Sequence, residues 1–465
     1  MRRSPEEATS ELQAAWDDMM ASLGEARDCL DVPDRMPAPA SDRMLAEGYR
    51  YLMGYLHAAI ERAFHSDPQQ PQFHNALSPI TRATIDNADA IYFYAAIDGR
   101  ESYLVRGQTG DHAHWRDPGA VCTAPKAPHY MIFEASEGVL AGDSGDLTEL
   151  MPGTKAQTGR LDSSTIEVAL DGSFEILFAP RRPADWTGNF VSTFRHMDSP
   201  HPTDPERGPE RFADYISGRQ LFYDWSIEEA IHLEISCLDR VGQVPPIYST
   251  DRAAAELRRC GQTARNQIQF WNAFWTILMG TYGERPGTLP GIGFRRNEFN
   301  QMNVAGLATG GGMSTNLYAG TIAALGPDEA LIVENQILET PQYVGLQLGN
   351  LWGESLEYAH RVGSRNGAQA RVDTDGRLRW VIAHGDPGVQ NWVDTSGHPE
   401  VFVAPRWAYS QTPEKKDWPQ VRCRKVPFGE VRDHLPKDTP TFSSEERQAE
   451  IKVRQRHVQQ RFRCF

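Results

Sequence analysis

The feature that most constrains the fold of this chain is the repeated alternation of short apolar segments with turn-forming residues. In residues 86–240 and again in residues 287–440, short runs of alternating apolar and polar side chains are separated by clusters of Gly, Asp, Asn and Pro. This pattern is typical of half-buried strands joined by tight turns. Asp171-Gly172 and Asp375-Gly376 are the clearest hairpin turns, because glycine tolerates the positive φ that such turns require. The sequence therefore predicts a mainly β protein with helical additions (α+β), built from antiparallel β units.

Two helices are expected before the strands begin. Ser4-Pro5-Glu6-Glu7 has the composition of a helix start, with Ser as the N-cap, Pro in the first turn and Glu reaching back, and this helix is expected to run to about Leu30. A second helix is expected from Ser41, after a Pro-rich break. Its expected buried face follows three- and four-residue spacing. The members of that face are Leu45, Tyr49, Leu52, Leu56, Ile60 and Phe64.

A long helix and a basic C-terminal helix are also expected. The long helix should begin at Thr250 and end near Tyr282, and its aromatic stripe is more typical of a core contact than of a cofactor site. Ser443 and Glu446 have capping-box spacing and open a helix rich in arginine. Such a charge run is usually a solvated face. In an acidic chain it could instead dock on a neighbouring subunit, which would make the protein a homo-oligomer.

These patterns divide the chain into five parts. The expected parts are an N-terminal helical region (1–85), an N-terminal β domain (86–240), a linking helix (250–283), a C-terminal β-sandwich domain (287–440) and a basic C-terminal helix (443–465). The stretch 180–209 is rich in Pro, Asp, Arg and Ser, so it is expected to cross the surface as a lid or a linker.

Composition and charge exclude several classes of protein. The formal net charge of −15 repels nucleic-acid phosphates, and no basic stripe interleaved with aromatic residues is present in the body of the chain. No apolar stretch is long enough to predict a membrane span, and the first residues lack the apolar core of a secretion signal. The six cysteines lack CxxC pairing, which favours buried, reduced thiols. We therefore expect a cytoplasmic protein that binds neither nucleic acid nor membrane.

Several spaced motifs resemble one bacterial family. Between Gly311 and Trp407 the chain contains LGPDEALIVE, NLWGESLEY, SRNGAQARVDTDGR and HGDPGVQNWVDTSGH, in that order. This run resembles the family catalogued as "domain of unknown function 1214". The segments Asp86 to Tyr92 and Tyr103 to Gly107 resemble the N-terminal region that accompanies that family. The resemblance implies jelly-roll-like β-sandwiches and suggests a catabolic role.

The first candidate site lies in a strand-loop-strand unit of the C-terminal domain. His384 and His398 could exchange a proton at neutral pH, and Asp386 could fix the tautomer of either ring, so these three residues are predicted to be catalytic. Three neighbours are predicted to bind substrate. They are Asn391, Trp392 and Asp394. The structural alternative is that Asp386 and Asp394 each cap a turn, with no catalytic part.

The second candidate site centres on Glu354. Its carboxylate lies next to Trp352, and an apolar neighbour that raises its pKa would suit a general acid. Asn350 and Trp352 are predicted to bind substrate, Trp352 as a wall of the pocket. Arg361 and Arg365 are also predicted to bind substrate, because two arginines four residues apart on a helix would share a face and hold an anion. Equally, Glu354 and either arginine could form a structural ion pair.

Motifs for bound cofactors are missing from the sequence. His112 and His114 would face the same way in a strand, and His129 could complete a metal site, but this reading is weakly supported and no metal is predicted. No nucleophile elbow and no dinucleotide fingerprint occur, so no nucleotide cofactor is expected. The sequence favours a hydrolase or lyase acting by acid/base chemistry on a small, partly apolar, oxygenated substrate. The alternative is a non-catalytic carbohydrate- or lipid-binding protein with an exposed platform formed by Trp380, Trp392, Trp407 and Tyr409.

Overall fold

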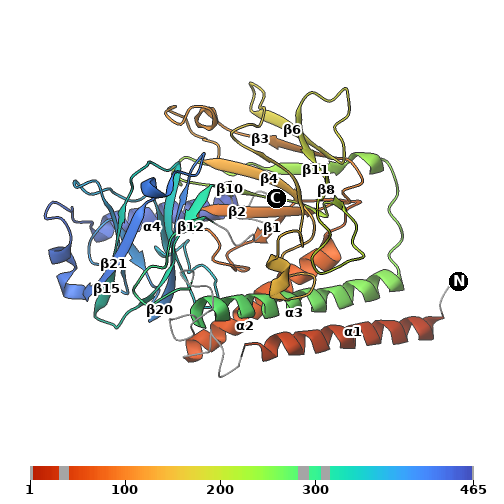
Figure 1. Ribbon diagram of the computed structural model, residues 1–465, viewed down its shortest axis with the longest axis horizontal. Coiled ribbons are helices and arrows are strands. Elements are labelled where there is room, and N and C mark those ends of the chain that lie inside the picture. The colour runs from red at the N-terminus through yellow and green to blue at the C-terminus, as the bar shows by residue number, and fades with distance from the viewer. Residues whose placement is uncertain (1–3, 31–40, 281–292, 305–314, 463–465) are drawn as a thin grey trace.

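The computed structural model describes residues 4–30, 41–280, 293–304 and 315–462. Two β-sandwiches pack against each other, and three long helices run along one side of them (Figure 1). These helices are α1 (Pro5–Asp28), α2 (Asp42–Ile60) and α3 (Thr250–Gly280), and α4 (Ser444–Arg461) follows the last strand. Shorter helical turns are η1 (Glu61–His65), η2 (Ala113–Trp115), η3 (Leu147–Leu150), η4 (Leu238–Arg240), η5 (Lys415–Asp417) and η6 (Phe428–His434). The predicted mainly β fold with helical additions is confirmed.

The N-terminal sandwich consists of two sheets. The sheet nearer the helices has the order β1-β2-β10-β4-β5, and the facing sheet has the order β11-β3-β6-β7. The strands are β1 (His74–Leu77), β2 (Ala90–Ala96), β3 (Tyr103–Gln108), β4 (Tyr130–Ser136), β5 (Gln157–Asp162), β6 (Ser173–Ala179), β7 (Asn189–Ser192), β10 (Tyr215–Leu221) and β11 (Leu233–Cys237). A separate ribbon pairs β8 (Phe194–His196) with β9 (Glu210–Phe212). The stretch 180–209 therefore contains strands of its own, where one surface excursion was expected.

The C-terminal sandwich is built in the same way. One sheet has the order β12-β13-β20-β16-β17, with β14 also paired to β20, and the facing sheet has the order β19-β18-β15-β21. The strands are β12 (Asn303–Val304), β13 (Asn316–Tyr318), β14 (Thr321–Ala324), β15 (Glu329–Gln336), β16 (Tyr343–Gly349), β17 (Ser364–Asn366), β18 (Leu378–Ala383), β19 (Trp392–Asp394), β20 (Glu400–Ala408) and β21 (Gln420–Pro427).

The two sandwiches repeat one topology. In the first sandwich β10 lies between β2 and β4, and in the second β20 lies between β13 and β16. The facing sheets, β11-β3-β6-β7 and β21-β15-β18-β19, also correspond strand by strand. Each ends in one parallel pair among otherwise antiparallel strands, formed by β6 with β7 and by β18 with β19. The sequence analysis did not predict this duplication.

Register makes individual residues of the two sandwiches equivalent. Leu221 of β10 is opposite Tyr130 of β4, and Ala408 of β20 is opposite Tyr343 of β16. The outer faces of the two sheets meet around these residues. They share an apolar cluster of Ala90, Leu221 and Tyr343, with Tyr92, Tyr130, Tyr223 and Ala408 packed against it. The junction between the sandwiches is therefore formed by corresponding positions of the two repeats.

The first helix and the long helix follow the sequence prediction. Ser4 caps α1 through a complete capping box with Glu7. On α3, the predicted stripe is buried against the sandwiches and the other helices, as Cys260, Ile268 and Trp275 illustrate. The predicted end of this helix beyond Gly280 lies outside the described residues.

The predicted buried face of α2 is only partly correct: Leu52 is buried, but two members of that face are exposed. Tyr49 and Ile60 are 45% and 42% exposed, and the helix instead buries a face that includes Gly48 and Tyr51. Gly48 lies against Trp352, where a β-carbon would come within 2.5 Å of the indole ring. The pattern of large apolar residues misled the prediction because the tightest contact is made at a residue with no side chain.

The basic helix α4 packs on its own chain, which corrects the expectation of a solvated or subunit-docking face. Arg447, Arg454 and Arg461, seven residues apart, are all buried beneath it. Arg454 donates to the carbonyls of Tyr358 and Ser364, and Arg461 donates to the carbonyl of Ala88. The helix thus joins the C-terminal sandwich to the segment that precedes β2.

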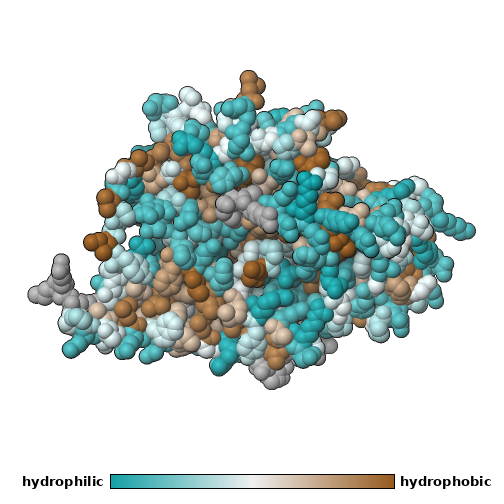
Figure 2. Space-filling model, turned by 180° about the vertical axis from the view of Figure 1, so that it is seen from behind, coloured by the Kyte–Doolittle hydropathy of each residue, from teal (hydrophilic) through white to brown (hydrophobic). Residues whose placement is uncertain are grey.

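One face of the molecule has a mixed surface. Figure 2 shows hydrophilic and hydrophobic residues mixed over the face opposite that of Figure 1. Among the described helices, none is both long enough and apolar enough to cross a membrane.

Candidate functional site

The predicted catalytic pair His384 and Asp386 is not formed. His384 Nδ1 lies 2.6 Å from the hydroxyl of Thr395, and its Nε2 lies 3.4 Å from the carbonyl of Leu325. One oxygen of Asp386 accepts the amide of Gly388 at 2.8 Å, and the other accepts Nε of Arg447 at 3.0 Å. The turn alternative is therefore correct for Asp386, and its second oxygen anchors α4.

Asn391 has a structural role, which the duplication reveals. Its Oδ1 accepts the amide of Arg371 at 2.8 Å, and its Nδ2 donates to the carbonyls of Arg371 and Arg379. Asn189, which begins β7 as Asn391 precedes β19, makes the same three bonds to the backbone of Glu167 and Glu175. Both sandwiches therefore use an asparagine to hold the parallel strand in place.

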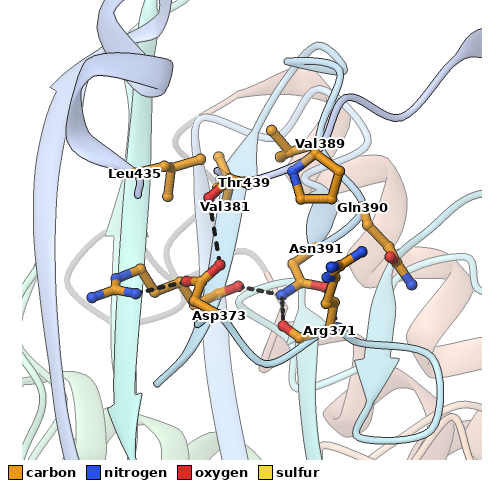
Figure 3. Close-up of a pocket in the computed structure, with 10 residues that line it drawn as sticks. Arg371, Asp373, Val381, Val389, Gln390, Asn391, Leu435 and Thr439 are labelled. Atoms are coloured by element: carbon orange, nitrogen blue, oxygen red, sulfur yellow. Dashed lines mark hydrogen bonds and ion pairs between the residues drawn. The ribbon is translucent and has the colours of Figure 1, made fainter. Parts of the chain in front are cut away.

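A small pocket lies beside Asn391, as Figure 3 shows. Its volume of about 20 Å³ is enough for about one water molecule. Asp373 enters this pocket and forms an ion pair with Arg379 at 2.6 Å. The pocket has room for little more than one water molecule, and the side chain of Asn391 beside it is bonded to the backbone through both its oxygen and its nitrogen.

The remaining residues of the first predicted cluster are also held by structural contacts. The indole of Trp392 donates to the carbonyl of Ala383 at 3.1 Å, and the guanidinium of Arg447 covers its ring. Asp394 caps the amide of Ser396 at 2.7 Å and pairs with Arg361 at 3.0 Å. The turn alternative is therefore correct for Asp394 as well.

The two predicted arginines do not share a face. Arg361 lies in a loop and is 55% exposed, whereas Arg365 lies in β17 and is 1% exposed. Arg365 pairs with Glu450 of α4 at 2.8 Å. The predicted clamp required a helix, and the segment is a loop and a strand.

Three predicted residues do come together, at the seam where α2 meets the loops of the C-terminal sandwich. Nε2 of His398 lies 2.8 Å from Oε1 of Glu47, and Nδ2 of Asn350 lies 3.2 Å from Oε2 of the same carboxylate. Asn350 also donates to Glu354 at 2.7 Å, and Arg50 pairs with Glu354 at 2.8 Å. We call His398, Glu47, Asn350, Glu354 and Arg50 the seam cluster.

Local structure explains how the loop presents these side chains. Asn350 Oδ1 accepts the amides of Trp352 and Glu354, so one side chain shapes the turn and its Nδ2 faces the two carboxylates. Gly353 has a φ of 77°, which lets the chain reverse there. Trp352, predicted to line the substrate site, donates its indole N–H to the carbonyl of Met44 at 2.7 Å and fixes the loop to α2.

The seam cluster places two carboxylates, bridged by the amide of Asn350, between a histidine and an arginine. Nδ1 of His398 lies 2.9 Å from the carbonyl of Thr395, so both ring nitrogens face oxygen atoms. Burial raises the pKa of Glu47, but hydrogen bonds and charges from His398 and Arg43 outweigh it and lower this pKa to about 2. Glu47 is therefore ionised at neutral pH.

Glu47 should make the protein sensitive to acid. Because its pKa in the folded state is lowered to about 2, the stability it contributes is present above about pH 4.5 and is lost as pH falls towards 2. We expect Glu47→Gln to remove up to about 3 kcal/mol of this pH-dependent stability. Denaturant unfolding at several pH values between about 6 and 3 would measure it. Curves for both proteins that stay parallel over that range would contradict the assignment.

Tyr51 and Tyr55 of α2 are buried next to each other, and Tyr51 contacts Trp352 in the loop that carries Glu354. Burial raises the pKa of Tyr51 and of Tyr55, and the charge of Glu354 raises both further. Apart from each other, neither hydroxyl has a hydrogen-bond partner among the described residues. Buried hydroxyls without partners are costly, so a polar group that reached them would be bound favourably.

Sequence reasoning missed Glu47 and Arg50. Arg43, Glu47 and Arg50 follow one another at intervals of four and three residues on α2, which places them on one face of the helix. This polar stripe was present in the sequence. It was overlooked because the helix was read only for its apolar face.

The histidines considered for a metal do not form a site. His112 and His114 flank or lie in η2, where a strand was expected, and His112 Nδ1 contacts the carbonyl of Gly110. His114 stacks on His129, and Nε2 of His129 lies 2.8 Å from the carbonyl of Gln342. Within the described ranges, no group of three or more His, Cys, Asp or Glu side chains has the arrangement of a metal site.

The tryptophan platform is not exposed. Trp380, Trp392, Trp407 and Tyr409 are all buried in the C-terminal sandwich. Their rings pack in its core or beneath α4, so they offer no surface on which a sugar could stack.

The chain was compared with family models, curated proteins and solved structures, and only solved structures are similar to it. No family model matches the chain, and no curated protein matches it. The chain is similar to an uncharacterized protein from Burkholderia cenocepacia, with 26% sequence identity and a TM-score of 0.70 over 91% of this chain and 99% of that one. It is less similar to the VPA0106 protein from Vibrio parahaemolyticus, with 9% identity and a TM-score of 0.40 over 87% and 100% of the two chains. The Burkholderia protein thus shares the fold over most of both chains.

Proposed function

We propose that the protein is a hydrolase- or lyase-type enzyme that uses acid/base chemistry at the seam cluster on a small, partly apolar, oxygenated substrate. The observation that carries this proposal is the unbroken chain of contacts from His398 through Glu47, Asn350 and Glu354 to Arg50. Such a chain holds acids, a base and a cation in fixed positions, which is the requirement for proton transfer.

Each member of the seam cluster has a role that fits its surroundings. Glu354, 1% exposed, is the residue we assign to proton transfer. Arg50 is 47% exposed and can turn from Glu354 towards an anionic oxygen of a substrate. His398 and Glu47 form a buried hydrogen-bonded pair. Glu47 helps to fix Asn350, because the amide of Asn350 donates to the carboxylates of both Glu47 and Glu354.

Removal of the proton-transfer group should abolish turnover without unfolding the protein. We expect Glu354→Gln to lower kcat at least about 100-fold, because the amide keeps the shape of the carboxylate but cannot exchange a proton. The first measurement is native mass spectrometry of the purified protein, which would reveal a retained small molecule and suggest a substrate class. Turnover would then be assayed on esters, lactones and hydroxy acids of that class, together with the melting temperature of each variant.

Asp386→Asn provides the matched control. This carboxylate was also predicted to be catalytic, but it caps a turn and holds Arg447, so the substitution should retain turnover. Equal rates for Glu354→Gln and the wild type, or no turnover of any compound tested, would contradict the proposal.

The setting of this activity is also part of the proposal. The cysteines in the described part of the chain form no disulfide bonds, which supports the proposal of a reducing, cytoplasmic location. They are Cys29, Cys122, Cys237, Cys260 and Cys423. We place the reaction in catabolism only through the family resemblance. The expectation of a homo-oligomer was based on the basic helix α4 docking on a second subunit. This helix is bound to its own chain, so it no longer supports that expectation.

A further inference from the structure

A second cavity lies between the first turns of α3 and the loop that follows η1. It is lined on one side by residues 66–68 and on the other by Arg252, Ala255, Glu256 and Arg259 of α3. Its volume is about 310 Å³, whereas the pocket beside Asn391 has a volume of about 20 Å³. Sites for small molecules have volumes of roughly 300–1,000 Å³, so this cavity has room for a small organic ligand.

One end of this cavity has two carboxylates around a single arginine. Nη2 of Arg252 lies 3.1 Å from Asp67, and its Nε lies 2.7 Å from Glu256. The hydroxyl of Tyr248 donates to the other oxygen of Glu256 at 2.7 Å, and the side chain of Glu256 is buried. Two carboxylates and one guanidinium leave one negative charge in excess, so this end of the cavity attracts a cation.

The other end has an arginine with no carboxylate beside it. Nη2 of Arg259 donates to the carbonyl of Ala63 at 2.8 Å, and within the described ranges this guanidinium forms no ion pair. A guanidinium has five N–H groups, so Arg259 retains donors for another acceptor. The side chain is exposed, which lets an anionic group reach it from solvent.

The helix sets the order of these groups along the cavity. Arg252, Ala255 and Arg259 follow one another at intervals of three and four residues, so they share one face of α3. Arg252 and Arg259 are about 10 Å apart along the helix axis, and the small side chain of Ala255 lies between them. The cavity therefore has an acidic end, an apolar stretch and a cationic end.

We propose that this cavity binds a linear zwitterion, a molecule with a carboxylate at one end, an ammonium group at the other and methylene groups between them. The carboxylate binds Arg259, because a guanidinium and a carboxylate form strong, charge-assisted hydrogen bonds. The ammonium group binds beside Asp67 and Glu256, and the methylene groups cover Ala255. A simple anion suits the cavity less well, because the two carboxylates repel it, and a simple cation leaves Arg259 without an acceptor.

This cavity is separate from the seam cluster. Arg50 of the seam cluster lies within α2, whereas Ala63, whose carbonyl accepts from Arg259, lies in η1 beyond the end of that helix. The two residues are about 20 Å apart along the helical chain. Binding in this cavity is therefore independent of the proposed proton transfer at Glu354.

Three probes of the same length test this proposal. ε-Aminocaproate has both charges, hexanoate has only the carboxylate, and hexylamine has only the ammonium group. We expect calorimetric titration of the full chain to show binding of ε-aminocaproate at millimolar concentration. Hexanoate and hexylamine should each bind at least about tenfold more weakly, because each leaves one end of the cavity without its partner.

Two substitutions on α3 test the placement of the ligand. Ala255→Leu fills the cavity without changing a charge and keeps a good helix former, so it should abolish binding of ε-aminocaproate. Arg259→Met should weaken that binding at least about tenfold. The matched controls are Ala449→Leu, at an exposed alanine of α4, and Arg258→Met, at the neighbouring arginine that pairs with Glu11 and Asp18 of α1, and both should leave binding unchanged.

Several outcomes would overturn the proposal. They are no binding of ε-aminocaproate at millimolar concentration, equally tight binding of hexanoate or hexylamine, or unchanged binding in folded Ala255→Leu or Arg259→Met protein. Circular dichroism would show whether each variant folds. If either does not, Asp67→Asn replaces it, because the amide retains an acceptor for the backbone N–H of Gln69 but removes the negative charge. That variant should weaken binding of ε-aminocaproate without weakening binding of hexanoate, and the opposite result would also contradict the proposal.

Discussion

Replacing Arg454 by alanine is expected to lower the free energy of unfolding by about 3 kcal/mol, because it removes a buried cation and leaves its acceptors unsatisfied. This guanidinium donates to the carbonyls of Tyr358 and Ser364 and to the side chain of Gln369, and all of it is buried beneath α4. Chemical denaturation with both far-UV circular dichroism and tryptophan fluorescence would measure the change.

The control for this prediction is two residues further along the same helix. Arg456 is exposed, so Arg456→Ala should change the free energy of unfolding by less than about 0.5 kcal/mol. Native mass spectrometry of both variants should show the same subunit count as the wild type, because α4 binds its own chain. Equal stabilities for the two variants, or a changed subunit count, would show that α4 does not stabilise the fold by binding its own chain.

Replacing Gly353 by alanine is expected to cost about 3 kcal/mol for two reasons that add. Its φ of 77° is unfavourable for any residue with a side chain, and a β-carbon there would lie 2.6 Å from Cε2 of Trp275 on α3. Gly353 also accepts the amide of Ile85 at 2.6 Å, so it cannot easily move away. Thermal and chemical unfolding would measure the loss.

Gly376→Ala separates the two causes. Gly376 has a φ of 78°, but nothing lies within 4 Å of the position that its β-carbon would occupy. The substitution should therefore cost only about 1 kcal/mol, the conformational part alone. If both alanine variants lose the same amount, the contact with Trp275 contributes nothing, and the packing of the loop against α3 is looser than described.

Much of the fold could be predicted from the sequence because local signals and tertiary structure agree there. The turn at Asp375-Gly376 forms with the expected positive φ, and the capping box at Ser4 starts α1. The face of α2 could not be predicted, because it depends on Trp352, which is distant in sequence and fits only over Gly48. The strand order of the sheets could not be predicted either, because the residues of a strand do not indicate which distant strand it pairs with.

The candidate site was predicted in part. His398, Asn350 and Glu354 belong to the seam cluster, but they were assigned to two separate sites, because nothing local indicates that α2 lies between them. Asn391 was assigned to substrate because an asparagine in a loop has the same appearance in a sequence whether it binds a ligand or a backbone. Comparison with Asn189 resolves the question, and that comparison requires the strand equivalence.

Two sandwiches of one topology that meet through corresponding faces have the geometry of a twofold homodimer, in which position i contacts position j and j contacts i. Here both copies belong to one polypeptide, so the association is intramolecular and does not depend on protein concentration. Covalent fusion also frees the copies to diverge. Glu134 in the first repeat corresponds by register to Gln347 in the second, so the junction carries a carboxylate on one side and an amide on the other. A symmetric ancestor could not have made that distinction.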